Sequence, residues 1–451
     1  MSAGMTRRAA LAAIAGGIAG ATASAGRATA QAIPTNPDVV VIGAGAAGLA
    51  AARELKAQGK SVVVVEAAGR MGGRAWTESE TFGVPYDQGA AWINASNINP
   101  FTRIAREGGF DLVDYTNAGS AFYVDGTRAT AAQSASYSRA WSAVGGALAK
   151  AGEAEQDIAA SEVIPKDIKY SGTVKAWIGP MDWGVDMSDL STADYWNSGE
   201  AQPSFMVREG LGAVVEYYGR DAPVVLNAPV SEIDWSGAGV RVTTSQGVIS
   251  AKAAIVTVST GVLASGAIRF TPALPLTTQE AVDGLPMGLL MKIALQFDGA
   301  KLGLADNSWL DYAVPENMPA KASFFVTWPF GGDISVGFAG GEFGWELSTA
   351  GPEAAVDFAL GELVKIAGSD ARKHFVKGAM SDWASNPLTL GAYAAARPGQ
   401  YGARAALEAP LGDKVWFAGE ALGGDYTGLV SGAYFSGKSM AQRLVTAGAA
   451  E

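Results

Sequence analysis

Short β-branched runs separated by Gly-rich turns dominate the chain just after residue 37. The runs Asp38–Ile42 and Ser61–Glu66 are almost wholly apolar, which is typical of parallel strands buried on both faces of a sheet. Between them, residues 49–58 favour a helix, and Gly59 with Lys60 turns the chain. The order strand, helix, strand predicts the start of an α/β domain.

The apolar pattern returns further along the chain. We predict buried strands at 254–258, at 415–420 and at 291–295, the last of which carries one lysine. Residues 307–340 alternate apolar and aromatic positions and are predicted to be sheet and core rather than substrate contacts. A C-terminal helix is predicted to begin within residues 428–437. No stretch after residue 30 is apolar and long enough to span a bilayer, so we expect no membrane anchor.

The turn between the first strand and the first helix has a pattern that binds dinucleotides. It reads Gly43-Ala-Gly45-Ala-Ala-Gly48, and the second strand ends in an acid, Glu66. Gly43 permits the tight turn, Gly45 lets the backbone approach a pyrophosphate at the helix N-terminus, and Gly48 lets helix and strand pack closely. Glu66 can accept hydrogen bonds from ribose hydroxyls. Because strand, helix, second strand and acid are all present, the pattern predicts dinucleotide binding.

The residues that follow favour FAD over NAD. The segment Gly69-Arg70-Met71-Gly72-Gly73-Arg74 places bare backbone and a guanidinium beside the same pyrophosphate. Shortly after it comes Asp87-Gln88-Gly89-Ala90-Ala91-Trp92. In this combination the chain resembles the flavin-containing amine oxidase family, which includes monoamine, polyamine and L-amino-acid oxidases.

The resemblance extends from about Asp38 to about Leu444, through matching segments around residues 206–212, 227–234, 286–293, 383–393, 415–420 and 428–437. It implies an α/β fold in which a Rossmann-type FAD-binding domain is interleaved with an α+β substrate domain that contains a mixed or antiparallel sheet. The FAD-binding domain would comprise residues 36–95, 205–285 and 380–447. The substrate-binding domain would comprise residues 96–204 and 286–379.

The resemblance also assigns roles to residues. The cofactor-binding positions that it implies are Gly43, Gly45, Ala47, Gly48, Glu66, Ala67, Gly73, Arg74, Gly89, Ala90, Ala91, Trp92, Val230, Trp383, Gly419, Glu420, Leu429 and Val430. Lys292 would act through a water near the flavin N5, and Tyr393 would form one side of an aromatic cage around the substrate amine. Leu429 stands where the second aromatic of the cage often lies, so the cage is half-built.

Composition narrows the chemistry. The chain of 451 residues has no cysteine and a single histidine, His374. A cysteinyl bond to flavin is therefore impossible, and Ala392 stands where monoamine oxidases carry that cysteine. We expect FAD to be bound non-covalently and no metal to be bound. The net charge of −11 argues against a nucleic-acid partner and suits a cationic or neutral small molecule.

The first 30 residues are interpreted as an export signal. Arg7 and Arg8 precede a mildly apolar Ala/Gly run and an Ala28-Thr29-Ala30 cleavage pattern, which is typical of a twin-arginine signal peptide. Twin-arginine export moves folded proteins, which suits one that loads its cofactor first. The expected location is the periplasm.

These features predict an FAD-dependent amine oxidase. It would transfer a hydride equivalent from a C–N bond of a small amine to flavin, release an imine for hydrolysis to an aldehyde or ketone, and return electrons to O₂ to give H₂O₂. A periplasmic dehydrogenase that uses a cytochrome acceptor, or a carbon–carbon desaturase, is the alternative. An L-amino-acid oxidase is disfavoured because Trp92 replaces the carboxylate-binding arginine of that branch. A non-catalytic flavin-fold binding protein is disfavoured by the intact phosphate loop. A homodimer is left open.

Overall fold

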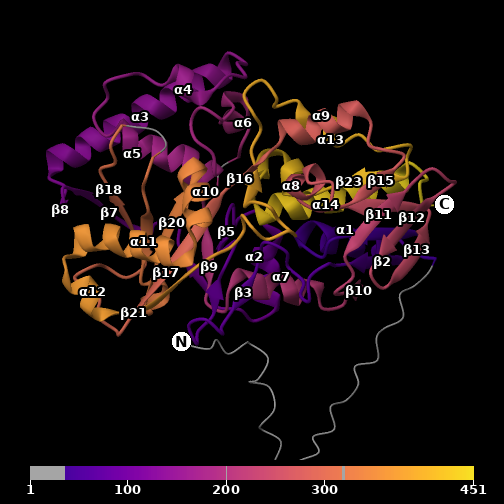
Figure 1. Ribbon diagram of the computed structural model, residues 1–451, viewed down its shortest axis with the longest axis horizontal. Helices are drawn as coiled ribbons and strands as arrows, with labels where there is room; N and C mark the ends of the chain where they lie inside the picture. The colour runs from indigo at the N-terminus through magenta and orange to yellow at the C-terminus, as the bar shows by residue number, and fades with distance from the viewer. Residues whose placement is uncertain (1–35, 200, 317–319, 451) are drawn as a thin grey trace, which may run out of the picture. The chain divides into compact units, whose positions relative to one another are not determined.

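A computed structural model describes residues 36–199, 201–316 and 320–450. These residues belong to one compact unit, built around two large sheets (Figure 1). The proposed signal peptide lies outside the described residues. The boundaries of the two interleaved domains stay a prediction, although each large sheet draws its strands from one set of the expected segments.

The first large sheet is parallel throughout and has the order β10-β2-β1-β14-β23. Its strands are β10 (Val224–Val225), β2 (Val62–Val65), β1 (Val39–Ile42), β14 (Ala253–Val256) and β23 (Val415–Phe417). Alternate residues of β1 point into different cores: Val39 and Val41 pack with helix residues on one face, whereas Val40 and Ile42 join a second core on the other. The sheet is therefore buried on both faces, as its apolar runs predict.

The second large sheet is mixed and has the order β21-β17-β20-β19-β18-β7-β8. Its strands are β21 (Phe375–Met380), β17 (Leu290–Phe297), β20 (Ile334–Gly340), β19 (Phe324–Thr327), β18 (Ser308–Tyr312), β7 (Gly119–Val124) and β8 (Thr127–Arg128). The β18–β7 pair is parallel and the other pairs are antiparallel. The predicted alternation over 307–340 thus resolves into β18, β19 and β20. Every residue of β19 and β20 is buried, and neighbouring residues such as Phe324 and Phe325 belong to two different hydrophobic cores.

Smaller sheets join these two. One has the order β13-β12-β11-β15, from β13 (Gly247–Ala251), β12 (Val240–Thr244), β11 (Val230–Asp234) and β15 (Arg269–Thr271). Another has the order β5-β9-β6, from β5 (Trp92–Ile93), β9 (Phe205–Val207) and β6 (Leu112–Asp114). Two pairs complete the set: β3 (Thr77–Glu78) with β4 (Tyr86–Asp87), and β16 (Met287–Gly288) with β22 (Tyr393–Ala394).

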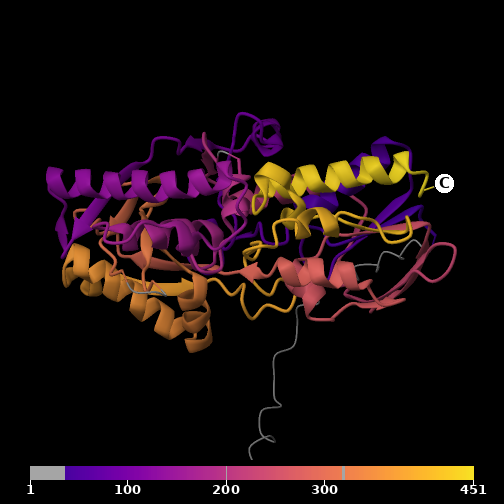
Figure 2. The same ribbon diagram turned by 90° about the horizontal axis from the view of Figure 1, so that it is seen from above.

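Helices cover the sheets. The α-helices are α1 (Ala46–Ala57), α2 (Pro100–Glu107), α3 (Ala131–Glu153), α4 (Ala160–Val163), α5 (Ser171–Ala176), α6 (Thr192–Trp196), α7 (Leu211–Gly219), α8 (Thr260–Ala264), α9 (Leu276–Gly284), α10 (Gly341–Ala350), α11 (Pro352–Ala367), α12 (Asp370–His374), α13 (Ala403–Leu407) and α14 (Val430–Thr446). Short 3₁₀ helices span Pro329–Gly331, Glu420–Leu422 and Gly424–Tyr426, and a π-helix, η1, spans Trp177–Trp183. In Figure 2, α3 and α14 lie on one side and α11 lies on the other.

One helix boundary differs from the predicted one. The first helix begins at Ala46, three residues earlier than expected, because Gly45 in extended conformation already serves as its N-cap. The C-terminal helix begins at Val430, within the predicted range 428–437, directly after Gly428 with φ +73° and an extended Leu429. Both helix N-termini therefore start beside a glycine-rich loop.

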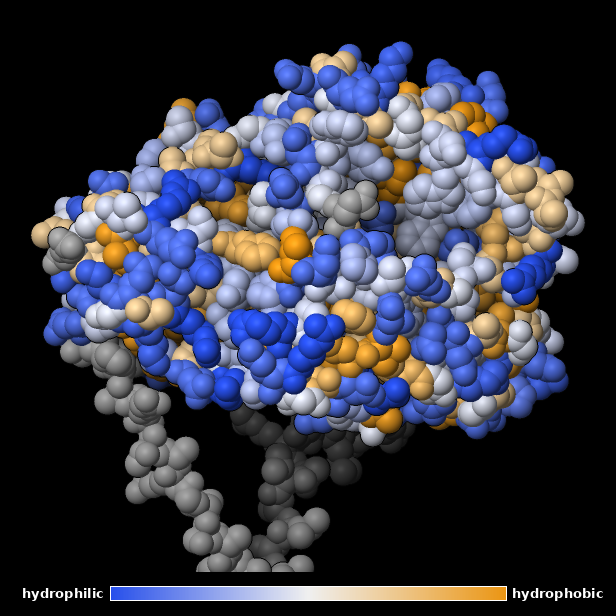
Figure 3. Space-filling view, turned by 180° about the vertical axis from the view of Figure 1, so that it is seen from behind, coloured by the Kyte–Doolittle hydropathy of each residue, from blue (hydrophilic) through white to orange (hydrophobic). Residues whose placement is uncertain are grey.

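The described surface is mostly polar. On the face in Figure 3, hydrophobic residues form scattered areas among hydrophilic ones. No helix among the described residues combines the length and hydropathy needed to cross a bilayer. Likewise, no group of three or more His, Asp or Glu side chains in the described ranges is arranged to hold a metal ion.

Candidate active site

The glycine-rich turn after β1 forms a tight cradle at the N-terminus of α1. Gly43 has φ +103°, and a Cβ at Gly48 would lie 1.9 Å from the carbonyl oxygen of Gly43. No side chain caps the helix at Gly45, so its first N–H groups are free to meet an anion. Glu66 is buried at the end of β2, where its carboxylate accepts hydrogen bonds from the main-chain N–H of Ala44 (2.7 Å) and Ala68 (2.8 Å). The acid thereby ties the two strand ends together around the cradle.

A second glycine-rich loop lies against the first. Gly45 and Gly72 form an isolated parallel β-bridge, and a Cβ on Gly73 would come 3.4 Å from the Cα of Gly45. Gly72 and Gly73 have φ +96° and +60°, a backbone conformation that glycine adopts most readily. The two loops together expose backbone at the start of α1, which is the surface that a pyrophosphate requires.

Arg74 connects this loop to the last strand of the parallel sheet. Its Nη1 donates to the Glu420 carboxylate at 2.8 Å and to the carbonyl oxygen of Ala392 at 2.8 Å. The Glu420 carboxylate also accepts from the Ala394 N–H at 3.1 Å. Arg74 therefore holds together three segments that are far apart in the sequence. Its predicted contact with phosphate stays a prediction.

The segment from Asp87 to Gly89 lies between Arg74 and the predicted substrate-binding domain. A Cβ on Gly89 would lie 1.8 Å from the carbonyl oxygen of Arg74, and the Ala90 N–H donates to that same oxygen at 3.1 Å. The buried Trp383 indole donates from Nε1 to the carbonyl oxygen of Gln88 at 3.0 Å. The requirement for glycine at position 89 is thus steric.

Lys292 meets the same segment from the other large sheet. It lies in β17, where Met291 and Ile293 face the core under α10 and α11, whereas Ala294 faces the core that includes Met181 and Phe338. By strand alternation Lys292 shares the face of Ala294. The lysine is 7% exposed, and its Nζ donates to the main-chain oxygen of Asp87 at 2.8 Å. The partner of this buried lysine in the structure is therefore a main-chain carbonyl, and its predicted action through a water near the flavin N5 stays a prediction.

Electrostatics and aromatic rings define the surroundings of Lys292. Burial lowers its pKa to about 8, opposed by the charge of Asp87. The ammonium lies 5.7 Å from the centre of the Trp92 ring, within the range of a cation–π contact. Trp92 in turn stacks on Trp309 with 5.6 Å between ring centres. Trp92 was predicted to touch the cofactor, and the structure places it in this aromatic wall.

Asp87 is anchored independently of the lysine. Its carboxylate accepts hydrogen bonds from Thr77 Oγ1 and from the N–H groups of Leu211 and Gly212. The latter two belong to the first turn of α7, where a carboxylate is favoured by the helix dipole. Burial nonetheless raises the pKa of Asp87. These bonds fix the position of the carbonyl that Lys292 uses.

Tyr393 lies beside the N-terminus of α14. It pairs with Gly288 across the β16–β22 ladder, its ring approaches the Cβ position of Gly428 at 3.9 Å, and its hydroxyl donates to the main-chain oxygen of Met181 at 3.1 Å. Burial, with the nearby carboxylates of Asp182 and Glu420, raises the pKa of Tyr393. Leu429 is the N-cap of α14 and no side chain caps the helix, so the N–H groups of the first turn are available to developing negative charge.

The remaining predicted positions border the same region or support it. Ala47 lies in the first turn of α1 and meets α14, since a Cβ on Gly437 would lie 2.0 Å from the Ala47 carbonyl. Val230 opens β11, which follows a segment hydrogen-bonded to the end of β2. The other positions are half-buried or buried loop and helix-start residues: Ala67, Ala91, Gly419 and Val430. His374 lies at the surface, 3.0 Å from Asp298, and its side chain is 41% exposed.

Sequence reasoning missed two features of this region. The first is a buried ion pair in which Arg404 binds Asp194 through two nitrogens at 2.8 Å and 2.7 Å and also donates to Thr427. It fixes the loop that leads to Tyr393 and α14, and nothing local in the sequence signals a pairing across 210 residues. The second is the π-helix η1, which contains Pro180 and ends beside Tyr393.

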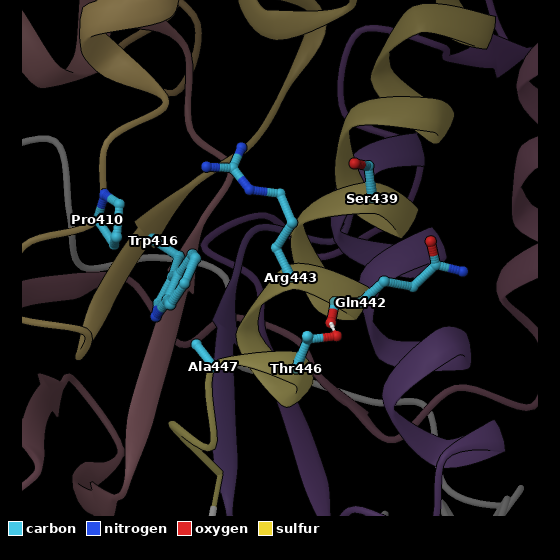
Figure 4. A pocket seen from close by; sticks show the side chains of 7 residues that line it. All are labelled: Pro410, Trp416, Ser439, Gln442, Arg443, Thr446 and Ala447. Carbon is cyan, nitrogen blue, oxygen red and sulfur yellow. Dashed lines mark hydrogen bonds between the residues drawn. The ribbon is translucent and has the colours of Figure 1, made fainter.

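A shallow hollow of about 450 Å³ lies elsewhere on the surface, lined by Pro410, Trp416, Ser439, Gln442, Arg443, Thr446 and Ala447. Figure 4 shows it between α14 and the end of the parallel sheet, with Thr446 Oγ1 donating to the carbonyl oxygen of Gln442. It contains none of the residues predicted to carry chemistry. The residues brought together around Arg74, Lys292 and Tyr393 are therefore the better candidate for the active site.

A family comparison decides the class of protein. The profile of flavin-containing amine oxidoreductases matches residues 46–174 and 185–445 of the chain. The chain belongs to this family. Residues 175–184, which include all of η1, lie outside both matched stretches.

Individual relatives agree with the family. The chain is 28% identical to polyamine oxidase 4 of Oryza sativa subsp. japonica over 440 residues, which covers 89% of this chain and 87% of that protein. It is 27% identical to lysine-specific histone demethylase 2 of Homo sapiens, across 91% of this chain and 53% of the demethylase.

Solved structures show the same fold. Putrescine oxidase bound to putrescine gives a TM-score of 0.77 at 20% identity, with 91% of this chain and 99% of that chain covered. Cyclohexylamine oxidase from Brevibacterium oxydans gives 0.72 at 23% identity, with 92% and 99% covered. This amine oxidoreductase therefore has the predicted α/β architecture.

The cofactor of the family is FAD, and the described residues fit it. The cradle at Gly43 and Gly48 has no room for a Cβ, and the uncapped starts of α1 and α14 provide N–H groups for a pyrophosphate and for negative charge on a ring. The chain as a whole has no cysteine to bond the flavin. Which of these residues touch the cofactor stays a prediction.

Proposed function

We propose that the protein is an FAD-dependent oxidase of small amines. The observation that carries the proposal is the pairing of the buried Lys292 ammonium with the Asp87 carbonyl beside Trp92, in a chain whose glycine loops suit FAD. FAD held by these loops would supply the acceptor for the hydride equivalent that leaves the carbon next to the amine nitrogen. The relatives named polyamine oxidases support an amine as the substrate.

The chain's own residues have separate tasks in this proposal. Tyr393 positions the substrate nitrogen with its ring face, while Leu429 leaves the opposite side open to bulkier groups. The first turn of α14 stabilises negative charge on the reduced cofactor. Lys292 holds a water and places a positive charge near the reacting region. The imine product leaves and is hydrolysed by water to an aldehyde or ketone.

Oxygen is the proposed electron acceptor. The test is an amine panel mixed anaerobically with purified protein, followed by air. Loss of the yellow flavin absorbance with an amine, followed by peroxide formation in air, supports an oxidase. Loss of colour without peroxide, together with reduction of added cytochrome c, would instead establish a dehydrogenase.

Amino acids are proposed to be poor substrates. Position 92 is Trp, whose neutral ring lies against Trp309 and cannot hold a carboxylate in the way that a guanidinium does. If L-amino acids reduce the flavin faster than amines of similar size do, this part of the proposal is wrong.

We further propose that the protein is exported in a folded state to the periplasm, on the basis of Arg7 and Arg8 in the N-terminal residues. Replacing both with Lys is expected to leave active, unprocessed enzyme in the cytoplasm. Unchanged export of the double variant would contradict the twin-arginine assignment.

A further inference from the structure

The guanidinium of Arg404, in α13, uses all five of its N–H groups inside the protein. Nε and Nη2 donate to the two carboxylate oxygens of Asp194 at 2.8 Å and 2.7 Å. Nη2 also donates to the main-chain oxygen of Ala394 at 3.3 Å. Nη1 donates to the main-chain oxygen of Ala421 at 2.5 Å and to Thr427 Oγ1 at 2.7 Å. One side chain therefore connects α6, the strand β22 and the loop that precedes α14.

Asp194 extends the connection from the other side of the ion pair. Its carboxylate also accepts a hydrogen bond from the N–H of Ala396 at 2.7 Å. The pair is buried, with Asp194 1% exposed and Arg404 8% exposed. Asp194 lies in the stretch predicted to form the substrate-binding domain, and Arg404 lies in the stretch predicted to bind FAD. The pair thus joins the two predicted sets of segments next to β22.

The main chain around Tyr393 is bound by charged side chains on both sides. Before it, the Ala392 oxygen accepts from Arg74 Nη1 at 2.8 Å. After it, the Ala394 N–H donates to the Glu420 carboxylate at 3.1 Å, and the Ala394 oxygen meets the buried pair described above. Tyr393 is therefore set in place by two ion pairs, of which the second also reaches the substrate side.

The same guanidinium determines how far Tyr393 lies from the start of α14. Thr427 Oγ1, which accepts from Arg404, donates in turn to the main-chain oxygen of Glu420 at 2.9 Å. The next residue is Gly428, whose Cβ position lies 3.9 Å from the Tyr393 ring. Arg404 consequently holds the segment of Tyr393 and the loop that enters α14 at one fixed separation.

A contribution to stability does not by itself explain this pair. Apolar residues of similar volume often replace a buried ion pair without loss of stability. What an apolar cluster lacks is direction. A guanidinium is planar, and its five N–H groups point at fixed angles, so acceptors from three segments are held in one geometry. Fixed geometry is what a substrate-orienting side chain requires.

We propose that Arg404, paired with Asp194, is a positioning residue for substrate binding. It holds Tyr393 against the start of α14, so that the ring face meets the amine nitrogen in the orientation that oxidation needs. This inference rests on the proposed amine oxidation and adds a residue to it. Arg404 acts through Tyr393 and takes no part in the transfer of hydride.

The first test is Arg404→Lys. Lysine keeps the charge that Asp194 requires, but its three N–H groups leave at least two of the five acceptors unpaired. For the best amine of the panel, Kd from the concentration dependence of anaerobic flavin reduction should rise about 10-fold. The α,α-dimethyl analogue of that amine has no hydrogen on the carbon next to nitrogen. Its Kd, titrated by flavin absorbance without turnover, should rise by a similar factor.

A double-mutant cycle separates positioning from general loosening of the structure. In Tyr393→Ala the ring that Arg404 is proposed to orient is absent. Adding Arg404→Lys to that variant should therefore raise the amine Kd by less than about twofold. A substitution that merely loosens the fold would raise it by the same factor in both backgrounds.

Arg443→Lys is the matched control. Arg443 lies in α14 and pairs with Glu408, at the end of α13, at 3.2 Å. It undergoes the same substitution in an ion pair between α13 and α14, and it should bind the amine as wild type does. Asp194→Asn is a second variant of the buried pair and should reproduce the rise in Kd. FAD content and circular dichroism establish that each variant is folded.

Three results would overturn the assignment. They are an amine Kd in Arg404→Lys within about twofold of wild type, an equal rise in the Tyr393→Ala background, and loss of FAD from both Arg404→Lys and Asp194→Asn, which would assign the pair to folding. Flavin reduction by no amine in wild type would instead contradict the proposed function. The two failures are therefore distinguishable.

Discussion

At the scale of single residues, Lys292 combines a charge with an environment that opposes it. It is 7% exposed, its Nζ donates to the Asp87 carbonyl, and its pKa is lowered to about 8 by burial. An apolar side chain of similar length would pack there at lower cost. A lysine at such a position has a task beyond packing. Substitution of Lys292 distinguishes a role in the flavin reaction from a role in the strand alone.

Replacing Lys292 with Met should slow one flavin half-reaction and spare the fold. Met has nearly the same volume and carries no charge to bury. Loss of one positioned polar contact of this kind costs about 100-fold, or roughly 2.7 kcal/mol. Stopped-flow measurement of flavin reduction and reoxidation, on protein with full FAD content, checks this. Wild-type rates in both half-reactions would mean that Lys292 is only a strand residue.

The lowered pKa of Lys292 also predicts how the rate of flavin reoxidation depends on pH. Because its pKa is lowered to about 8, the side chain is charged below that pH and neutral above it. A positive charge stabilises negative charge that develops nearby, so the rate of flavin reoxidation should fall as the pH rises through about 8. The step should be absent in Lys292→Met and present in Lys377→Met, which alters an exposed lysine on the neighbouring strand β21. A step that survives in Lys292→Met would assign it to another group.

At the scale of elements, the packing of α1 against the turn after β1 and against α14 depends on two residues without side chains. A Cβ at Gly48 would lie 1.9 Å from the Gly43 carbonyl oxygen, and one at Gly437 would bring α14 into the Ala47 carbonyl at 2.0 Å. Both contacts are with backbone, which cannot move aside without shifting a strand or a helix. The start of α1 and the body of α14 are therefore each set by a close approach to main-chain atoms.

A pair of glycine substitutions tests this. Gly48→Ala should lower the free energy of unfolding by about 3 kcal/mol or more and abolish FAD retention, because the helix must move away from the strand. Gly146→Ala should instead raise the free energy of unfolding. Gly146 lies within α3 with nothing near its Cβ position, so Ala should stabilise by about 0.5–1 kcal/mol. Thermal melts and flavin absorbance of both variants give the comparison. Retained FAD in Gly48→Ala would contradict the steric argument.

At the scale of the whole molecule, the candidate active site is assembled from segments distant in sequence. The carbonyl oxygens of Asp87 and Gln88 receive Lys292 and Trp383, which lie 205 and 295 residues further along. Arg74 reaches Glu420 across 346 residues. Cofactor binding and folding are expected to be strongly linked, since FAD would contact several of these segments at once.

The manner of FAD attachment is a property of the whole chain. With no cysteine in 451 residues and His374 paired to Asp298 at the surface, we expect no covalent bond to flavin. Acid precipitation should release all of the yellow colour into the supernatant. Colour that stays with the pellet would show a covalent link and direct attention to His374.

The local pattern of apolar residues and glycines was sufficient to predict the buried strands and the tight turn after β1. The apolar run of β1 and the glycines after it required only neighbouring residues, because a strand buried on both faces must be apolar throughout and a tight turn must contain glycine. The same holds for the isolated lysine of β17, whose apolar neighbours indicated burial. The start of α1 lies three residues earlier than predicted because N-cap geometry depends on backbone angles that composition does not reveal.

Tertiary structure alone decided what the buried polar groups meet. Nothing near Lys292 in the sequence indicates the Asp87 carbonyl, and nothing near Arg404 indicates Asp194. Hydrophobic periodicity is a local property, whereas the partner of a charge is selected by which distant segments the fold brings together.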